Sequence, residues 1–298
     1  MSPSKILSAG LQYFYISKAL RAFICACLSM SFLFCYSNAA SKEQTNSSEW
    51  ELSATAGIDQ YKATELRNGK LFNRDTGHLK MLGLGIDYAG FAGWRLGADL
   101  QQSQGDMNYF GLTQTLLPFA TISKVNFTQL DLHANRRFSI SDSFWIAPGV
   151  GIRRTTWDRN IQPAGFITGL REDMTSIDAR ATVTASYRLQ ERVGSTAIAL
   201  SAGYIRGLSN SLQINFQSGT DPFSLKPATA SGSEIALRLS HAVNPALRLD
   251  LAWHSDHWRA GQSETKNITS AGQPLGTATY PGVAIKRQGW RFTLTKGW

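Results

Sequence analysis

Short segments in which apolar and polar side chains alternate with a period of two recur along most of the chain. The longest covers 177–188, where Ile, Ala, Ala, Val, Ala and Tyr alternate with Asp, Arg, Thr, Thr, Ser and Arg. Successive side chains of a β-strand point to opposite faces, so each segment predicts a strand with one apolar and one polar face. Ten such strands are predicted, near 50–59, 82–88, 94–100, 130–135, 144–154, 177–188, 198–204, 234–239, 247–253 and 289–298. The segment 144–154 is the least regular, and the pattern leaves its facing open.

The links between these strands alternate strictly between short and long. The short links fall near 89–93, 139–143, 190–195 and 241–245, and the long ones near 67–78, 103–123, 158–173, 207–232 and 255–282. A ten-stranded outer-membrane barrel that starts and ends in the periplasm has four short turns and five long external loops. The pattern therefore predicts an all-β fold, a transmembrane antiparallel up-and-down β-barrel. A soluble β-sandwich can show the same alternation but does not require it.

The last ten residues form an alternating segment that stops on an aromatic side chain. Trp290, Phe292 and Leu294 share one face of the predicted strand, and Trp298 ends the chain. This ending resembles the C-terminal assembly signal of bacterial outer-membrane barrels, which Gly289, Phe292, Leu294 and Trp298 would carry here. The resemblance implies a place in the outer membrane of a Gram-negative cell and the barrel-assembly machinery as a partner.

The first 40 residues have the layout of a secretory signal peptide. Lys5, Lys18 and Arg21 are the only charged side chains in residues 1–21, and the apolar stretch 22–36 is followed by small residues at 37–40. A membrane anchor needs about 20 apolar residues, more than this stretch provides. We therefore expect a signal peptide at 1–40 and a mature barrel at 41–298 with no second domain.

No cofactor and no metal site are predicted. All three cysteines lie within 25–35, inside the predicted signal peptide. The mature chain thus has no disulfide and no cysteine ligand. Gly83, Gly85 and Gly97 do not form a nucleotide-binding loop, and within strands they indicate curvature or close packing inside the barrel.

The charge of the chain bears on its partners. Removing the three positive charges of the predicted signal peptide lowers the formal net charge from +9 to +6. No compact Lys/Arg run or aromatic-rich binding motif accompanies this charge, so nucleic acid is not an expected partner. Outer-membrane lipid and an acidic lipopolysaccharide surface fit the positive charge better. The sequence does not identify a surface ligand.

The polar faces of the predicted strands carry charges of both signs that would point into the lumen. The residues are Asp59, Asp87, Arg95, Asp99, Asp131, His133, Asp178, Arg180, Glu234, Arg238, Arg248, Asp250, Arg287 and Arg291. Buried charges persist only when they are paired, so we expect ion pairs and hydrogen bonds that fill a narrow barrel. A wide diffusion channel is formed by about 16 strands. A minor or gated pore remains an alternative.

The predicted architecture is similar to the omptins, the ten-stranded outer-membrane proteases, across the whole mature chain. An omptin site has an aspartate pair on one side of the cleft and an Asp/His pair on the other, with the histidine as general base. Here Asp106 stands alone in the second long link, and Asp221 in the fourth has no histidine beside it. Asp131 and His133 have Asp-x-His spacing but lie within a predicted strand. The protease hypothesis therefore lacks its catalytic set, and fold alone does not transfer activity.

A second candidate for chemistry is the cluster His254, Ser255, Asp256 and His257, which is flanked by tryptophans at the outer end of the ninth strand. It resembles the His and Ser of outer-membrane lipid A deacylases, in which a histidine activates a serine nucleophile. The residues that follow the serine depart from their pattern. Two histidines and an aspartate also suit a metal, although such spacing is weakly diagnostic. The alternative that we favour is a polar rim between interfacial tryptophans.

The sequence leaves three functions open. We favour a non-enzymatic outer-membrane barrel that binds through its external loops, because loops on a rigid scaffold often carry recognition. The alternatives are an outer-membrane hydrolase, either omptin-like or acting on lipid A, and a narrow gated pore.

Overall fold

The computed structural model describes residues 49–298 except 68, 92, 113–116, 190–194 and 218–219. The predicted signal peptide at 1–40 lies outside the described residues. The described chain is built mainly from β-strands. None of its described segments is a helix long and apolar enough to cross a membrane.

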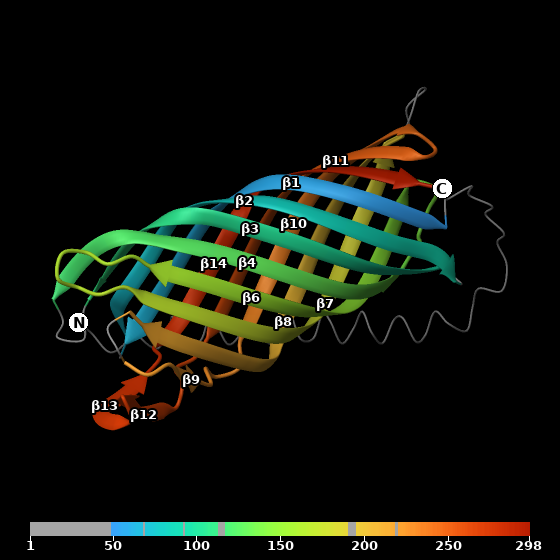
Figure 1. Ribbon diagram of the computed structural model, residues 1–298. Helices are drawn as coiled ribbons and strands as arrows, with labels where there is room; N and C mark the ends of the chain where they lie inside the picture. Colours follow the sequence, from blue (N-terminus) through green and yellow to red (C-terminus); the bar gives the residue numbers. More distant parts are fainter. Residues whose placement is uncertain (1–48, 68, 92, 113–116, 190–194, 218–219) are drawn as a thin grey trace, which may run out of the picture. The chain divides into compact units, whose positions relative to one another are not determined.

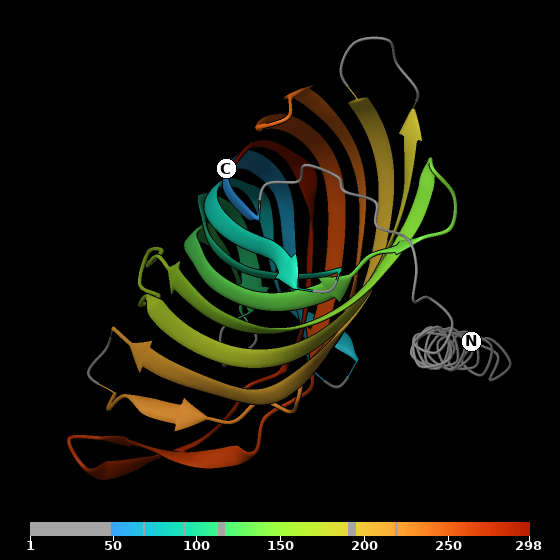
Figure 2. The ribbon, with the colours of Figure 1, turned by 90° about the vertical axis from the view of Figure 1, so that its right-hand side faces the viewer.

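Ten long strands, each antiparallel to its neighbours, close into a barrel (Figure 1). They are β1 (Trp50–Arg67), β2 (Lys70–Phe91), β3 (Trp94–Leu112), β4 (Pro118–Arg136), β6 (Phe144–Ile161), β7 (Leu170–Leu189), β8 (Ser195–Phe216), β10 (Ser231–Asn244), β11 (Leu247–Ala260) and β14 (Gly282–Gly297). The pairing of β1 with β14 closes the sheet, and the strands curve around a common interior (Figure 2). The predicted ten-stranded barrel is confirmed.

Four shorter strands complete the described part of the chain. β5 (Phe138–Ser139) pairs with β6, and β9 (Phe223–Leu225) pairs with β8. β12 (Thr265–Ser270) and β13 (Gln273–Thr279) form a separate hairpin in the connection between β11 and β14. We call the end of the barrel that holds Trp50 and Trp298 the terminal end, and the opposite end, where this hairpin lies, the loop end. The Trp298 amide donates to the Trp50 carbonyl at 3.1 Å, so the two ends of the described chain meet there.

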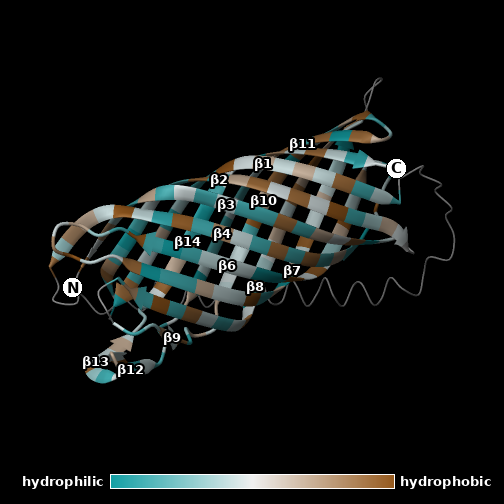
Figure 3. Ribbon diagram, viewed as in Figure 1, coloured by the Kyte–Doolittle hydropathy of each residue, from teal (hydrophilic) through white to brown (hydrophobic). Residues whose placement is uncertain are grey.

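An apolar belt surrounds the barrel beside the terminal end. Its outward side chains include Trp50, Leu52, Ile58, Leu82, Leu84, Leu96, Leu100, Leu130, Leu132, Val150, Ile152, Ile198, Leu200, Leu237, Leu251, Trp290, Phe292 and Leu294, all exposed. Brown and teal positions alternate along these strands in Figure 3. Apolar side chains on the outside and polar ones on the inside are the arrangement of a barrel embedded in lipid.

Beyond the belt, the polarity of the two faces reverses. On β1 the outward side chain changes from Ile58 to Gln60 and Lys62, while the inward ones become Tyr61 and Ala63. The strand continues without a break, but the apolar positions move from even to odd numbers. A pattern that changes phase in this way reads in the sequence as the end of a strand.

The predicted extents of the long loops are therefore wrong. The first, 67–78, shrinks to the two residues between the end of β1 at Arg67 and the start of β2 at Lys70. Most of 103–123 belongs to β3 and β4. Much of 158–173 and 207–232 is also strand, and β11 extends to Ala260 inside the range 255–282. The physical reason is that the strands extend beyond the apolar belt. Alternation with apolar side chains on the lipid-facing side therefore marks only the part of each strand near the terminal end.

Candidate functional site

The lumen at the height of the belt is lined by charged side chains. All the residues predicted to face the lumen lie on inward positions of their strands, including Arg95, Asp99, Asp131, His133, Asp178, Arg180, Arg238, Arg248, Asp250 and Arg291. The contacts among them divide into three groups along the barrel axis.

The first group lies at the terminal end. Glu51 Oε1 lies 2.8 Å from Arg95 Nη2, and Glu51 Oε2 lies 3.2 Å from Arg248 Nη2. Arg248 Nε is also 3.2 Å from Asp250 Oδ2. These contacts tie β1, β3 and β11 together across the lumen. Glu51 was not predicted as a lumen residue. The first strand was recognised by its lipid-facing side chains, beginning with Trp50, and Glu51 lies on the opposite, inward face.

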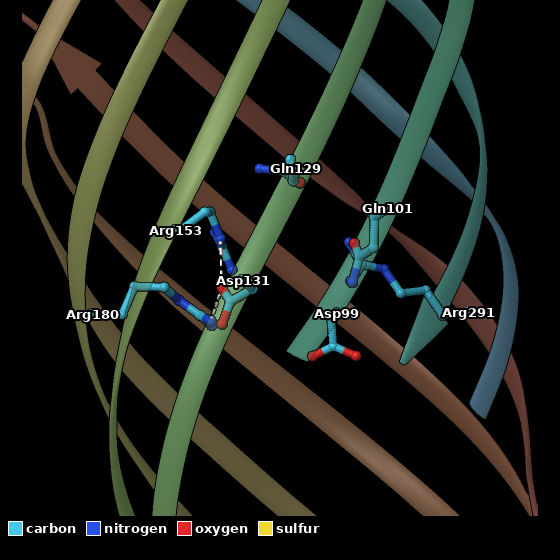
Figure 4. A pocket seen from close by; sticks show the side chains of 7 residues that line it. All are labelled: Asp99, Gln101, Gln129, Asp131, Arg153, Arg180 and Arg291. Carbon is cyan, nitrogen blue, oxygen red and sulfur yellow. Dashed lines mark hydrogen bonds and ion pairs between the residues drawn. The ribbon is translucent and has the colours of Figure 1, made fainter. Parts of the chain in front are cut away.

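In the second group, two arginines bridge two carboxylates. Arg153 Nε donates to Asp131 Oδ2 at 3.0 Å and its Nη2 to Glu234 Oε2 at 3.4 Å. Arg180 donates to the same two carboxylates. A small cavity of about 120 Å³ adjoins this group, and its lining residues are Asp99, Gln101, Gln129, Asp131, Arg153, Arg180 and Arg291 (Figure 4). Its polar lining and its size suit a few water molecules.

His133 belongs to the second group and lies among three aspartates. Its Nε2 is 3.2 Å from Asp87 Oδ1, and its Nδ1 is 3.5 Å from Asp99 Oδ2 and 3.8 Å from Asp131 Oδ1. A Cβ at Gly97 would collide with Asp87 and His133. The glycine on β3 therefore provides the space in which this histidine packs, consistent with close packing inside the barrel.

The third group contains His254 and Asp256, only two of the four residues of the predicted His/Ser cluster. On β11, His254 and Asp256 point into the lumen, whereas Ser255 and His257 occupy the alternate, outward positions. His254 Nε2 lies 3.3 Å from Asp59 Oδ1, and Arg287 Nη2 lies 2.8 Å from Asp256 Oδ2. The strand puts the His254 ring and the Ser255 hydroxyl on opposite sides of the barrel wall. They do not form a nucleophile and its base.

The residues singled out by comparison with the omptins do not form one site. Asp106 is on an outward position of β3, and Asp221 lies beside the β12–β13 hairpin. Asp131 and His133 face the lumen within the belt. No set of His, Cys, Asp and Glu in the described part of the chain has the arrangement of a metal site.

An apolar layer lies above the three charged groups. Its buried members include Tyr61, Leu79, Met107, Val125, Phe127, Trp157, Met174, Leu212, Val283 and Ile285. Phe127 stacks on Trp157 with ring centroids 6.1 Å apart, and the guanidinium carbon of Arg287 lies 5.1 Å from the Phe127 ring centroid, below the layer. Side chains from eight of the ten strands meet here, so the layer forms the hydrophobic core of the barrel.

Beyond the apolar layer, one arginine is buried with three carboxylates. Arg159 Nη2 lies 2.7 Å from Glu172 Oε2 and contacts Glu65, while its Nη1 is 3.1 Å from Asp75 Oδ2. Asn73 donates to Glu65 at 2.6 Å. We call Glu65, Asp75, Arg159 and Glu172 the Arg159 cluster. None of these four was singled out from the sequence, although each continues the inward parity of its strand.

The Arg159 cluster lies outside the apolar belt, and its excess of carboxylates perturbs their proton affinities. Burial raises the pKa of Glu172 to about 8, with Arg159 opposing the increase and Glu65 adding to it. Burial likewise raises the pKa of Asp75 to about 6. The cluster can therefore hold a proton at neutral pH, which brings its charge closer to balance.

The loop end displays a structured turn and a pinned hairpin. Ala164 and Ile167 exchange two backbone hydrogen bonds of 3.0 Å across Gly165 and Phe166, and the Phe166 side chain is 88% exposed. Gly165 has a φ of 58°, which suits a two-residue hairpin turn. Asp221 accepts hydrogen bonds from the Thr269 hydroxyl at 2.6 Å and from the amides of residues 271 and 272 at 3.1 Å.

Comparison with known proteins finds similarity in structure only. No known family matches the chain, and no curated protein matches its sequence. The outer membrane protease OmpT from Escherichia coli is similar, with a TM-score of 0.60 and 8% identity, covering 87% of this chain and 100% of that one. The translocator domain of the autotransporter NalP from Neisseria meningitidis gives a TM-score of 0.44 and 10% identity, covering 93% and 98% of the two chains.

At such identities the similarity to OmpT shows the fold alone. The outward apolar belt is the surface that faces lipid. The sheet has no open edge because β1 pairs with β14. A closed barrel is one of the two structures that satisfy all backbone hydrogen bonds within lipid. The chain has the fold and the lipid-facing surface of a ten-stranded integral outer-membrane β-barrel.

Proposed function

We propose that the protein is a non-conducting outer-membrane barrel that acts through its loop end. The observation that carries this proposal is the order of the inward side chains along the strands. On β6 they run from Thr155 through Trp157 to Arg159, and on β14 they run from Arg287 to Ile285 and Val283. Polar, apolar and charged layers thus follow one another across the lumen. An ion would have to cross a buried apolar layer, which is costly.

Conductance of the purified protein in planar bilayers tests the closed lumen. We expect wild-type protein to be silent. The double substitution Trp157→Gly and Met107→Gly removes two side chains that are 1% and 0% exposed, and we expect it to give measurable current because it opens the apolar layer. Heat-modifiable migration in gels checks that both proteins are folded. Reproducible channel steps from the wild type would overturn the proposal.

The loop end offers a surface for binding. Phe166 stands on a turn held by two backbone hydrogen bonds, so its ring is presented without a large loss of backbone entropy on binding. Leu117 and Leu275 are also exposed in connections at this end. Rigid aromatic side chains are typical anchors of binding surfaces.

Adhesion of cells that display the protein tests this surface. The probe is glass coated with phenyl groups, with glycol-coated glass as a reference. We expect Phe166→Ser to reduce adhesion to the phenyl surface several-fold. Ile140→Ser is the matched control, because Ile140 is 60% exposed but lies in a turn at the terminal end. Equal adhesion of the wild type and Phe166→Ser would contradict a role for this turn.

The geometry gives less support to a hydrolase. His254 is paired with Asp59 and Arg291 inside the lumen, and Ser255 faces outward. A general base must lie within hydrogen-bond reach of the group that it deprotonates. Turnover of a peptide or of lipid A that is lost in a folded His254→Ala variant would favour the hydrolase instead.

A further inference from the structure

A row of basic side chains crosses three adjacent strands on the outer surface, just beyond the apolar belt. Lys62 on β1 is in register with Lys286 on β14, and Lys286 is in register with His257 on β11. All three occupy outward positions, as do the belt residues Trp290 and Ile58 of the same strands. We call Lys62, Lys286, His257 and the neighbouring outward Arg259 the basic face.

Lys62 and Lys286 have no outward carboxylate on their own strands. The neighbouring outward positions beyond the belt are occupied by Gln60, Thr64, Ala284, Gln288 and Ser255 within the fully described spans of β1, β11 and β14. Like charges directly opposite each other on neighbouring strands are destabilising. The register of Lys62 with Lys286 therefore costs stability unless an anion lies between them.

The opposite wall of the barrel does not share this arrangement. There Arg171 on β7 lies 2.5 Å from Asp158 and 3.3 Å from Asp173. On the neighbouring strands, Lys124 is in register with Asp106. The outward cations Arg171 and Lys124 thus have carboxylates beside them, whereas Lys62 and Lys286 lie in register with each other.

The basic face is placed where lipid headgroups lie. Trp290 and Trp253 lie in register on neighbouring strands at the edge of the belt nearer the loop end, and Lys286 precedes Trp290 by four residues. At about 3.4 Å per residue and a strand tilt of about 40°, that separation is about 10 Å along the membrane normal. Tryptophan rings favour the boundary between acyl chains and headgroups, and lysine side chains reach along it.

Arg259 fixes which nitrogen of the His257 ring can donate a hydrogen bond. Arg259 Nε donates to His257 Nε2 at 3.2 Å, which leaves His257 Nδ1 as the donor of a neutral ring. Burial, together with the charges of Arg259 and Lys286, holds the pKa of His257 below its ordinary value. At neutral pH the face thus combines ammonium, guanidinium and imidazole N–H donors, all of which suit phosphate oxygens.

We propose that the basic face binds the phosphate group of a membrane lipid whose acyl chains lie against Trp253 and Trp290. Charge complementarity and continuity with the apolar belt support a lipid over a free anion, because only a lipid would contact both surfaces at once. This inference is independent of the closed lumen and of the binding turn at Phe166.

Native mass spectrometry of the full chain in zwitterionic detergent measures the binding directly. The probes are dioleoyl phosphatidic acid, which has a phosphate monoester, and dioleoyl phosphatidylcholine, in which choline neutralises the phosphate. We expect one phosphatidic acid molecule to be retained. A lysine near an anionic lipid contributes about a fivefold change in affinity, so K62Q/K286Q should bind about thirtyfold more weakly.

The matched control is K124Q/R154Q, which removes Lys124 on β4 and the outward Arg154 on β6 from the opposite wall. It should bind phosphatidic acid like the wild type. An equal loss of affinity for phosphatidic acid in K124Q/R154Q would overturn the proposal, because the lipid would then be attracted by the net charge of the protein rather than by the basic face. Equal retention of phosphatidylcholine would also overturn it. Displacement of the lipid by millimolar inorganic phosphate would show that the face takes a free anion rather than a lipid, and would overturn the assignment to a lipid.

A stability measurement distinguishes binding from folding defects. In zwitterionic detergent alone, K62Q/K286Q should melt at the same or a higher temperature than the wild type, because the repulsion between the two lysines is gone. Phosphatidic acid should then raise the melting temperature of the wild type and leave that of K62Q/K286Q unchanged. A variant that melts lower and is still stabilised by the lipid would contradict the proposal.

Discussion

Arg159 on β6 and Glu172 on β7 form an ion pair of 2.7 Å inside the barrel, with side chains only 1% and 4% exposed. Glu65 and Asp75 contact the same guanidinium. The outer half of the lumen is therefore held by one cation and three carboxylates, which lie above the apolar layer that fills the barrel.

Removal of Arg159 should strongly destabilise the barrel. Arg159→Met keeps most of the side-chain volume but leaves three buried carboxylates without their partner. Breaking a buried pair from one side costs about 3–5 kcal/mol. The check is the urea midpoint of the detergent-folded protein, with Arg171→Met as control because Arg171 is half exposed. An equal midpoint for Arg159→Met and the wild type would contradict the role given to the Arg159 cluster.

The same cluster predicts how stability depends on pH. Glu172 has a pKa of 4.5 in the unfolded chain and about 8 in the folded barrel. The folded state thus binds the proton more tightly, so this group stabilises the barrel below pH 4.5 and loses that contribution as the pH rises towards 8. We expect the free energy of unfolding to fall between pH 5 and pH 8 and Glu172→Gln to weaken that dependence. Denaturant titrations at several pH values measure it, and identical slopes for both proteins would be evidence against the assignment.

Gly97 should not tolerate a side chain. A Cβ there would meet Asp87 and His133, so Gly97→Ala must displace the contacts around His133. Overpacking of this kind costs about 1–3 kcal/mol. Gly83→Ala is the matched control, because its new Cβ would mainly meet the flexible Gln101 side chain at 3.1 Å. The folded fraction, read from heat-modifiable migration, should be lower for Gly97→Ala than for Gly83→Ala.

Asp221 should hold the β12–β13 hairpin in place. Its carboxylate accepts three hydrogen bonds from the hairpin, and those bonds lower its pKa. The contribution is present above the unfolded pKa of about 3.9 and is lost as the pH falls below it. Limited trypsin digestion at Lys266 should be faster for Asp221→Ala than for the wild type at pH 7. Asp158→Ala, on an outward position of β6, controls for loss of a surface carboxylate.

The lipid-facing half of each strand could be predicted from the sequence because its signal is local. Leu82, Leu84 and Ile86 repeat every second residue, and membrane lipid requires that repeat wherever a strand faces it. Inward charges such as Asp99 and Asp131 then follow from parity. The predicted strand ends were wrong because the polarity of the two faces reverses beyond the belt. On β1 the inward side chains Tyr61 and Ala63 are apolar, whereas the inward side chains within the belt are polar.

Partners could not be predicted in the same way. Arg159 contacts Glu65, which is 94 residues away, and Asp75, which is 84 residues away. The alternating pattern gives the direction of each side chain but not its height relative to a distant strand. His254 and Ser255 show the converse, because they are neighbours in sequence but the strand places their side chains on opposite faces.

The sequence by itself determined a barrel, its number of strands and the face that each strand turns to lipid, because these depend on a two-residue period and on the solvent at each face. The tertiary structure alone decided how far the strands extend beyond the membrane and which charges meet. Both depend on the registers that closure of β14 on β1 imposes around the ring. Closure brought Lys62 beside Lys286 on the outside and carried β6 and β7 to the place where Arg159 meets its carboxylates.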